Sequence, residues 1–203
     1  MTDYFALFNE QRRPWFDPDA LKQKFLGLSA EVHPDRVHNA TEQEKRAAQE
    51  RYTLLNAAYN CLREPKERLL HLLELERGAK PQQVQNIPSD LMDLSLEVSR
   101  LCREADRVIA EKAKATSPLL KVQVFEKAQQ CTEKLFGLQN ELGARYNEFA
   151  NELKDIDRHW QEGRSSVAAT PSSLTDRLEE LYRLFSFFTR WRAQIQERIV
   201  QLA

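Results

Sequence analysis

The chain has 203 residues, of which 41% are hydrophobic and 30% are charged, so it is long enough and apolar enough to bury a packed core. Only 5 residues are glycine, while Leu, Glu, Ala, Arg and Gln recur throughout, which favours an all-α fold over a turn-rich sheet protein. The 30 basic and 31 acidic side chains leave a net charge of −1, which excludes a general electrostatic attraction to nucleic acid or to an anionic membrane.

The three cysteines, Cys61, Cys102 and Cys131, are far apart in the sequence and have no histidine at metal-ligand spacing. This pattern argues against a zinc site or a disulfide framework, so we expect free thiols, no metal and no cofactor. The N-terminus lacks a basic leader followed by a long apolar core, and no later stretch reaches transmembrane length. We therefore expect a cytoplasmic protein that makes no contact with membranes.

Two helices are predicted before residue 34. The segment 3–9 is expected to form a short helix. Its buried side is expected to hold Tyr4, Leu7 and Phe8. Asp17 and Pro18 predict the start of a second helix, because Asp caps free backbone N–H groups and Pro suits the first helical position. The buried stripe of this second helix is expected to contain Leu21, Phe25, Leu28 and Val32.

A loop and a third helix follow. Pro34 cannot continue a helix and disfavours helical geometry at His33, so the second helix is expected to end there. An exposed loop then reaches about Ala40, and Thr41 with Glu44 forms a capping box that starts the third helix. The buried face of the third helix is expected to carry Ala48, Tyr52, Leu55, Tyr59 and Leu62.

A fourth, short helix is predicted after Pro65. It includes residues 69–75 and ends at Gly78, because glycine and a nearby proline are typical of helix ends. Residues 79–87 have the composition of a linker.

The second half of the chain predicts three long amphipathic helices. The first has a seam of Leu91, Leu94, Val98, Leu101, Ala105 and Val108 and ends before Ser117-Pro118. The apolar pattern of the next helix is long enough to predict more than forty residues. Its seam is expected to hold Phe125, Ala128, Cys131, Leu135, Leu138, Leu142, Tyr146, Phe149, Leu153, Ile156 and Trp160. After a polar stretch, 163–173, the last helix is expected to bury Leu174, Leu178, Leu181, Phe185, Phe188, Ile195, Ile199 and Leu202. Three such helices in sequence predict an antiparallel bundle.

The tripeptide His33-Pro34-Asp35 is the most informative motif in the sequence. It lies between two predicted helices with complementary apolar stripes, is preceded by the aromatic segment 4–8, and is followed by the segment 54–62 and Pro65. This arrangement resembles a J-domain.

The opening segment 4–8, Tyr-Phe-Ala-Leu-Phe, resembles in particular the HscB type of iron–sulfur cluster co-chaperone. The resemblance is strongest over residues 3–75 and extends to Leu91-Met92 and to the segment 184–191. The regions it implies are an N-terminal four-helix J-domain over 1–78, a linker over 79–87, and a C-terminal antiparallel three-helix bundle over 88–203 that binds a client.

The same resemblance implies that the His33-Pro34-Asp35 loop stimulates the ATPase of a seventy-kilodalton heat-shock chaperone. The chemistry then occurs in the partner, and the chain itself is not an enzyme. J-domains usually carry a basic face on the second helix, whereas the segment 29–31 is Ser-Ala-Glu here. The remaining candidates for basic contacts to the chaperone are Lys22, Lys24 and Arg36.

In the HscB family the bundle binds the scaffold protein on which iron–sulfur clusters are assembled. The expected client-binding residues are Leu91, Met92 and Leu96 on the first bundle helix and Leu184, Phe187 and Trp191 on the last. Ser95 departs from the pattern, because direct alignment requires an apolar residue there and Leu96 is offset by one. On the last helix the three residues form a second apolar stripe, which indicates either a client surface or a wider core face. On the first reading, Phe187→Ala is expected to weaken scaffold binding with little loss of stability.

Three other functions are weighed against this one. An enzyme that uses His33 and Asp35 lacks any accompanying nucleophile-elbow or phosphate-loop motif. A J-domain adaptor for another client, or for a second copy of itself, fits the same motifs. A purely structural coiled coil leaves the His33-Pro34-Asp35 loop unexplained.

Overall fold

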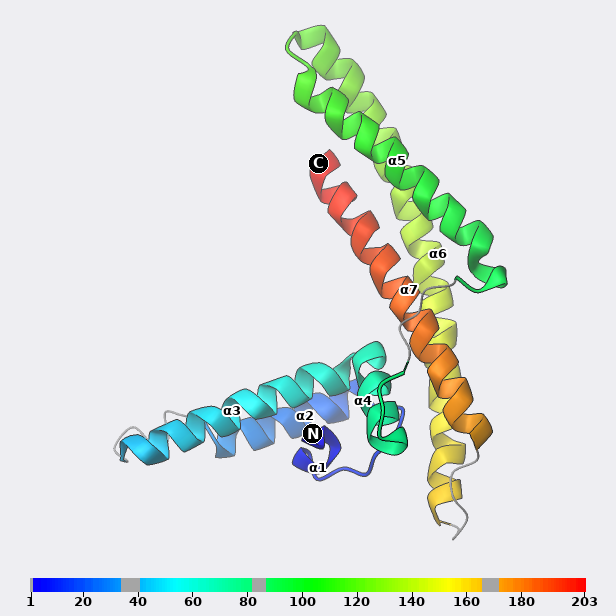
Figure 1. Ribbon diagram of the computed structural model, residues 1–203. Helices are drawn as coiled ribbons and strands as arrows, with labels where there is room; N and C mark the ends of the chain where they lie inside the picture. Colours follow the sequence, from blue (N-terminus) through cyan, green and yellow to red (C-terminus); the bar gives the residue numbers. More distant parts are fainter. Residues whose placement is uncertain (1, 34–40, 82–86, 166–171) are drawn as a thin grey trace. The chain divides into compact units, whose positions relative to one another are not determined.

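The computed structural model describes residues 2–33, 41–81, 87–165 and 172–203, and over these ranges it is all-α, as the composition predicts. The helices in chain order are α1 (Tyr4–Leu7), α2 (Pro18–Glu31), α3 (Glu42–Arg63), α4 (Pro65–Arg77), the 3-10 turn η2 (Ser89–Leu91), α5 (Met92–Lys114), α6 (Pro118–Ser165) and α7 (Ser172–Leu202) (Figure 1). Within the described ranges, none of these helices has the length and the low charge needed to cross a bilayer.

The predicted helix ends of the N-terminal region are confirmed. Asp17 accepts a hydrogen bond from the backbone N–H of Ala20 at 2.8 Å, and Pro18 is the first residue of α2. Thr41 and Glu44 form the reciprocal capping box of α3. Gly78 ends α4 with a φ of 70°, a left-handed conformation in which a side chain would be strained.

The chain divides by its contacts into two compact units, which we call unit 1 (Met1–Gln82 and Ala150–Tyr182) and unit 2 (Gln83–Phe149 and Arg183–Ala203). The boundary between unit 1 and unit 2 after Gln82 falls within residues 79–87, the segment expected to be a linker. Contacts also group the second half of α6 and the start of α7 with the N-terminal helices, an association that no local sequence pattern indicates.

In unit 1, α3 packs against α1, α2 and α4. The first four helices bury Phe5, Phe8, Leu21, Leu55, Ala58, Leu62, Leu69, Leu72 and Leu73. The prediction for α1 is right for Phe8 but omits Phe5, which is fully buried where Tyr4 and Leu7 are only partly covered. A four-residue helix has one turn, so its periodicity cannot define a face, and contact with α3 decides which ring turns inward.

In unit 2, α5 runs antiparallel to α6 and parallel to the end of α7 (Figure 1). Lys134 and Lys127 of α6 pair with Glu104 and Glu111 of α5 at 2.6 and 2.7 Å, so residue numbers rise along one helix as they fall along the other. Lys112 of α5 donates to the carbonyl oxygen of Leu202 at 3.0 Å. These contacts form a three-helix bundle.

The predicted seams are largely confirmed. All six seam residues of the α5 region, Leu91, Leu94, Val98, Leu101, Ala105 and Val108, are buried. On α6 the prediction is wrong at Phe125, which is 68% exposed, while Val124 is buried in its place. Val124 and Phe125 precede Ala128 by four and three residues, so both satisfy the helical period. Val124 lies beside Glu111 and Lys114 of α5, and packing against α5 selects it.

Candidate functional site

His33 follows the last turn of α2 and is the residue of the His33-Pro34-Asp35 tripeptide that the structure describes. The ring meets Tyr52 of α3 edge to face, with centroids 5.4 Å apart and an interplanar angle of 77°. Further along the same helix pair, Phe25 stacks on Tyr59 at 4.2 Å. These two aromatic contacts join α2 to α3 and set the position from which the loop departs. Pro34, Asp35 and Arg36 lie outside the described residues.

The two lysines of α2 that we expected to contact a chaperone differ in their surroundings. Lys22 is exposed. Lys24 forms an ion pair with Glu10 and donates to the carbonyl oxygen of Asn9 at 3.3 Å, so it fastens α2 to the segment after α1. Lys22 is therefore the freer of the two to meet an acidic partner.

The base of the N-terminal helices contains two buried polar side chains that the sequence analysis did not single out. Arg68 is 3% exposed and donates to the carbonyl oxygens of Pro14, at 2.7 Å, and Leu62. His71 accepts a hydrogen bond at Nε2 from the backbone N–H of Tyr4 at 3.1 Å. Both satisfy backbone groups at helix ends, and Arg68 also satisfies one in the segment between α1 and α2. Neither interaction has a local sequence signature.

Burial lowers the pKa of His71, and nearby Asp3 and Glu74 oppose that effect only in part. The ring lies 5.7 Å from that of Phe5, nearly parallel to it. His71 is thus a packed residue whose neutral form is favoured by burial.

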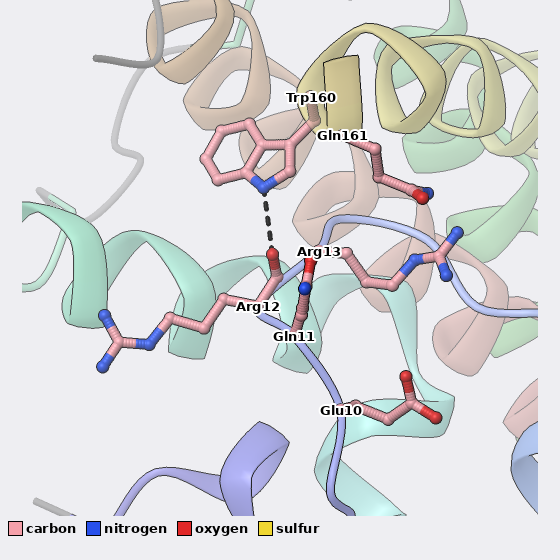
Figure 2. Close-up of a pocket in the computed structure, with 6 residues that line it drawn as sticks. All are labelled: Glu10, Gln11, Arg12, Arg13, Trp160 and Gln161. Carbon is pink, nitrogen blue, oxygen red and sulfur yellow. Dashed lines mark hydrogen bonds between the residues drawn. The ribbon is translucent and has the colours of Figure 1, made fainter. Parts of the chain in front are cut away.

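The segment after α1 is held within unit 1 by α6. Trp160 donates from its indole N–H to the carbonyl oxygen of Arg12 at 3.0 Å (Figure 2). Beside this bond is a shallow cavity of about 200 Å³ lined by Glu10, Gln11, Arg12, Arg13, Trp160 and Gln161. Sequence reasoning placed Trp160 on the buried seam but found neither its partner nor the cavity, because the two segments are 148 residues apart.

The expected client-binding residues fall into two groups. On α5, Met92 and Leu96 are 45% and 60% exposed, while the neighbouring Leu91 is buried. On α7, all three expected residues, Leu184, Phe187 and Trp191, are at most 5% exposed. The second apolar stripe of α7 is therefore part of a wide buried face, the alternative that the spacing left open.

The three cysteines carry free thiols, as predicted. Burial raises the pKa of Cys61 to about 11, and it raises the pKa of Cys102 and Cys131 as well. In the part of the chain that the structure describes, no group of three or more His, Cys, Asp or Glu side chains is arranged to hold a metal ion.

No family model matches the chain. Individual relatives do: the co-chaperone HscB homologue of Azoarcus sp. is 42% identical over 73 residues, and that of Shewanella loihica is 36% identical over 74 residues. Over these residues the chain is similar in sequence to HscB co-chaperones. These matches span 36% of the chain and only 41% and 43% of the two HscB relatives, about two fifths of their length.

The HscB fold extends over the whole chain. The structure of HscB from Vibrio cholerae covers 100% of both chains with a TM-score of 0.62 at 19% identity. The human co-chaperone HscB covers 98% of this chain and 81% of its own, with a TM-score of 0.58 at 20% identity. The predicted HscB type is thus confirmed for the fold.

Proposed function

We propose that this chain is a co-chaperone that stimulates the ATPase of a seventy-kilodalton heat-shock chaperone and carries no reaction of its own. The observation that supports the proposal is the place of His33-Pro34-Asp35 in the chain, between the paired helices α2 and α3 of a protein related to HscB. His33 offers a ring nitrogen, Pro34 restricts the backbone, and Asp35 offers a carboxylate to a basic group of the partner. Lys22 adds an exposed positive charge on α2.

The client in this proposal is an iron–sulfur scaffold protein, held on the outer face of α5. Met92 and Leu96, one helical turn apart, provide the apolar contact. The same face continues with Arg103 and Arg107, which are exposed and form no ion pair within the described ranges. A client that fits this face therefore presents an apolar side chain next to acidic groups.

The proposal is tested by the ATPase rate of a purified seventy-kilodalton chaperone of iron–sulfur assembly. The wild-type chain is expected to raise that rate, and His33→Gln is expected to abolish the increase while leaving helical content and melting temperature unchanged. His159→Gln, an exposed histidine of α6, is the matched control and should stimulate normally. Equal stimulation by the two variants would rule out the His-Pro-Asp mechanism.

Binding to the scaffold protein distinguishes the proposed client from another one. Leu96→Ser should weaken scaffold binding at least tenfold, with ATPase stimulation in the absence of scaffold unchanged. Stimulation of the chaperone without any scaffold binding by the wild-type chain would favour the alternative function, a J-domain adaptor for a different client.

A further inference from the structure

Exposed apolar side chains gather at the start of α6. Among the described residues, the large hydrophobic side chains that remain exposed include Leu119, Leu120, Val122, Phe125 and Phe136, all within nineteen residues of one helix. Phe125 leaves 68% of its surface in solvent and Phe136 leaves 47%. Val122, Phe125 and Phe136 lie on one side of the helix and together leave an apolar area on the order of 300 Å², the size of the largest apolar patch on many monomers.

The exposed residues follow a heptad pattern of their own. Val122, Phe125, Gln129, Thr132 and Phe136 are separated by three, four, three and four residues, so they form one stripe, which we call the outer seam. The inner seam of α6, which includes Val124 and Ala128, is buried in the three-helix bundle. The outer seam holds no charged residue, although 30% of the chain is charged. A helix with two such seams has the pattern of one that packs on both sides.

The charges beside the outer seam favour a second copy of the same helix in parallel orientation. In a parallel pair, Lys121 on one flank of the seam lies opposite Glu126 of the other copy, because flanking positions five residues apart meet across the pair. An antiparallel pair would instead bring Glu126 close to Glu133, two like charges. Neither Lys121 nor Glu126 takes part in an ion pair within the described ranges, so both are available.

We propose that the outer seam of α6 is a self-association surface through which two copies of this chain form a parallel coiled-coil dimer. Phe125 and Phe136 supply the apolar layers, and Gln129 pairs with its counterpart, a polar layer that sets the register. The apolar side chains of two outer seams bury about 600 Å² in total, below the range for stable specific interfaces. The dimer is therefore weak and reversible.

Sedimentation velocity of the full chain over a range of concentrations tests the proposal. The mean mass is expected to rise from 23.7 kDa towards twice that value as concentration increases. Phe125→Ser should raise the dimer dissociation constant at least tenfold. Val200→Ser, which alters a 65% exposed residue of α7, is the matched control and should dimerise as the wild type does. A wild-type chain that remains monomeric up to about 1 mM overturns the proposal.

Charge reversal tests the orientation and does not depend on the phenylalanine variant remaining folded. Lys121→Glu and Glu126→Lys should each weaken the dimer, and the double variant should restore it, because the two charges exchange places across a parallel pair. Strengthening by Glu126→Lys alone would overturn the parallel arrangement, since it would relieve repulsion by Glu133 in an antiparallel one. Circular dichroism of each variant confirms that helical content is retained.

Discussion

Arg13 and Asp157, 144 residues apart in the sequence, meet side by side in unit 1 through two hydrogen bonds. The guanidinium Nε lies 3.1 Å from Oδ1, while Nη2 pairs with Oδ2. Asp157 is 2% exposed, and it also accepts hydrogen bonds from the backbone N–H of Trp15 and from Gln161. Its carboxylate thus links the N-terminal segment to the second half of α6.

Asp157→Ala is expected to lower the free energy of unfolding by about 2 kcal/mol, because it leaves the Arg13 guanidinium and two further donors without their acceptor. The value is below that of a fully buried pair, since the Arg13 side chain is 25% exposed. Asp155→Ala removes a carboxylate two residues away that pairs with Arg158 on the surface, and it should change stability by less than about 0.5 kcal/mol. Urea denaturation of both variants checks the prediction, and equal stabilities would contradict it.

Acidification is expected to destabilise the chain through His71. Its folded-state pKa is lowered, first by burial, so the unfolded chain binds the proton more readily. The contribution to stability is present above the unfolded pKa of about 6.5 and is lost as pH falls through the folded pKa. Protonation also removes the Nε2 lone pair that accepts from Tyr4. Asp3, Glu74 and Arg12 are the charged groups that act on this ring.

The measurement for His71 is the urea midpoint at several pH values from 7.5 to below 6. His71→Gln should be less stable at neutral pH and should lose part of the pH dependence over this window. His159→Gln, which changes an exposed histidine, should keep the wild-type profile. An unchanged profile in His71→Gln would assign the pH dependence to other groups.

Phe187→Ala is expected to destabilise the fold rather than act on a binding surface. The ring is 3% exposed, lies 5.7 Å from Trp191 and is covered on one face by the guanidinium of Arg190. Truncation of a buried phenylalanine costs about 3 kcal/mol. Leu96→Ala, at a 60% exposed position, should cost less than about 0.5 kcal/mol. Thermal unfolding distinguishes the two variants. A normal melting temperature for Phe187→Ala would contradict a structural role and favour a role of Phe187 in client binding.

Cys61 is expected to react slowly with alkylating reagents. Burial raises its pKa to about 11, and its Sγ donates to the carbonyl oxygen of Glu67 at 3.4 Å. Only the thiolate is nucleophilic, so at pH 8 its rate with iodoacetamide should be at least about tenfold below that of free cysteine. Peptide mass spectrometry of the folded chain gives this rate, with urea-unfolded chain as the control. Equally fast labelling of folded and unfolded chain would contradict the prediction.

The sequence by itself determined the features that depend on residues within one or two helical turns. Asp17, Thr41 and Gly78 end or begin helices as predicted, because a cap needs only its neighbours three or four positions away. The seam of α5 was predictable for the same reason, since the spacing of its apolar residues defines one narrow face of the helix.

Tertiary structure decided which of several apolar faces is covered. Phe125 and Phe187 both satisfy a helical period, yet Phe125 is exposed and Phe187 is buried, because the packing of neighbouring helices selects between adjacent stripes. The pair of Arg13 and Asp157 depends on a contact between segments 144 residues apart, for which neither segment carries a local signal. Periodicity defines the faces of a helix, and only the packed fold assigns a partner to each face.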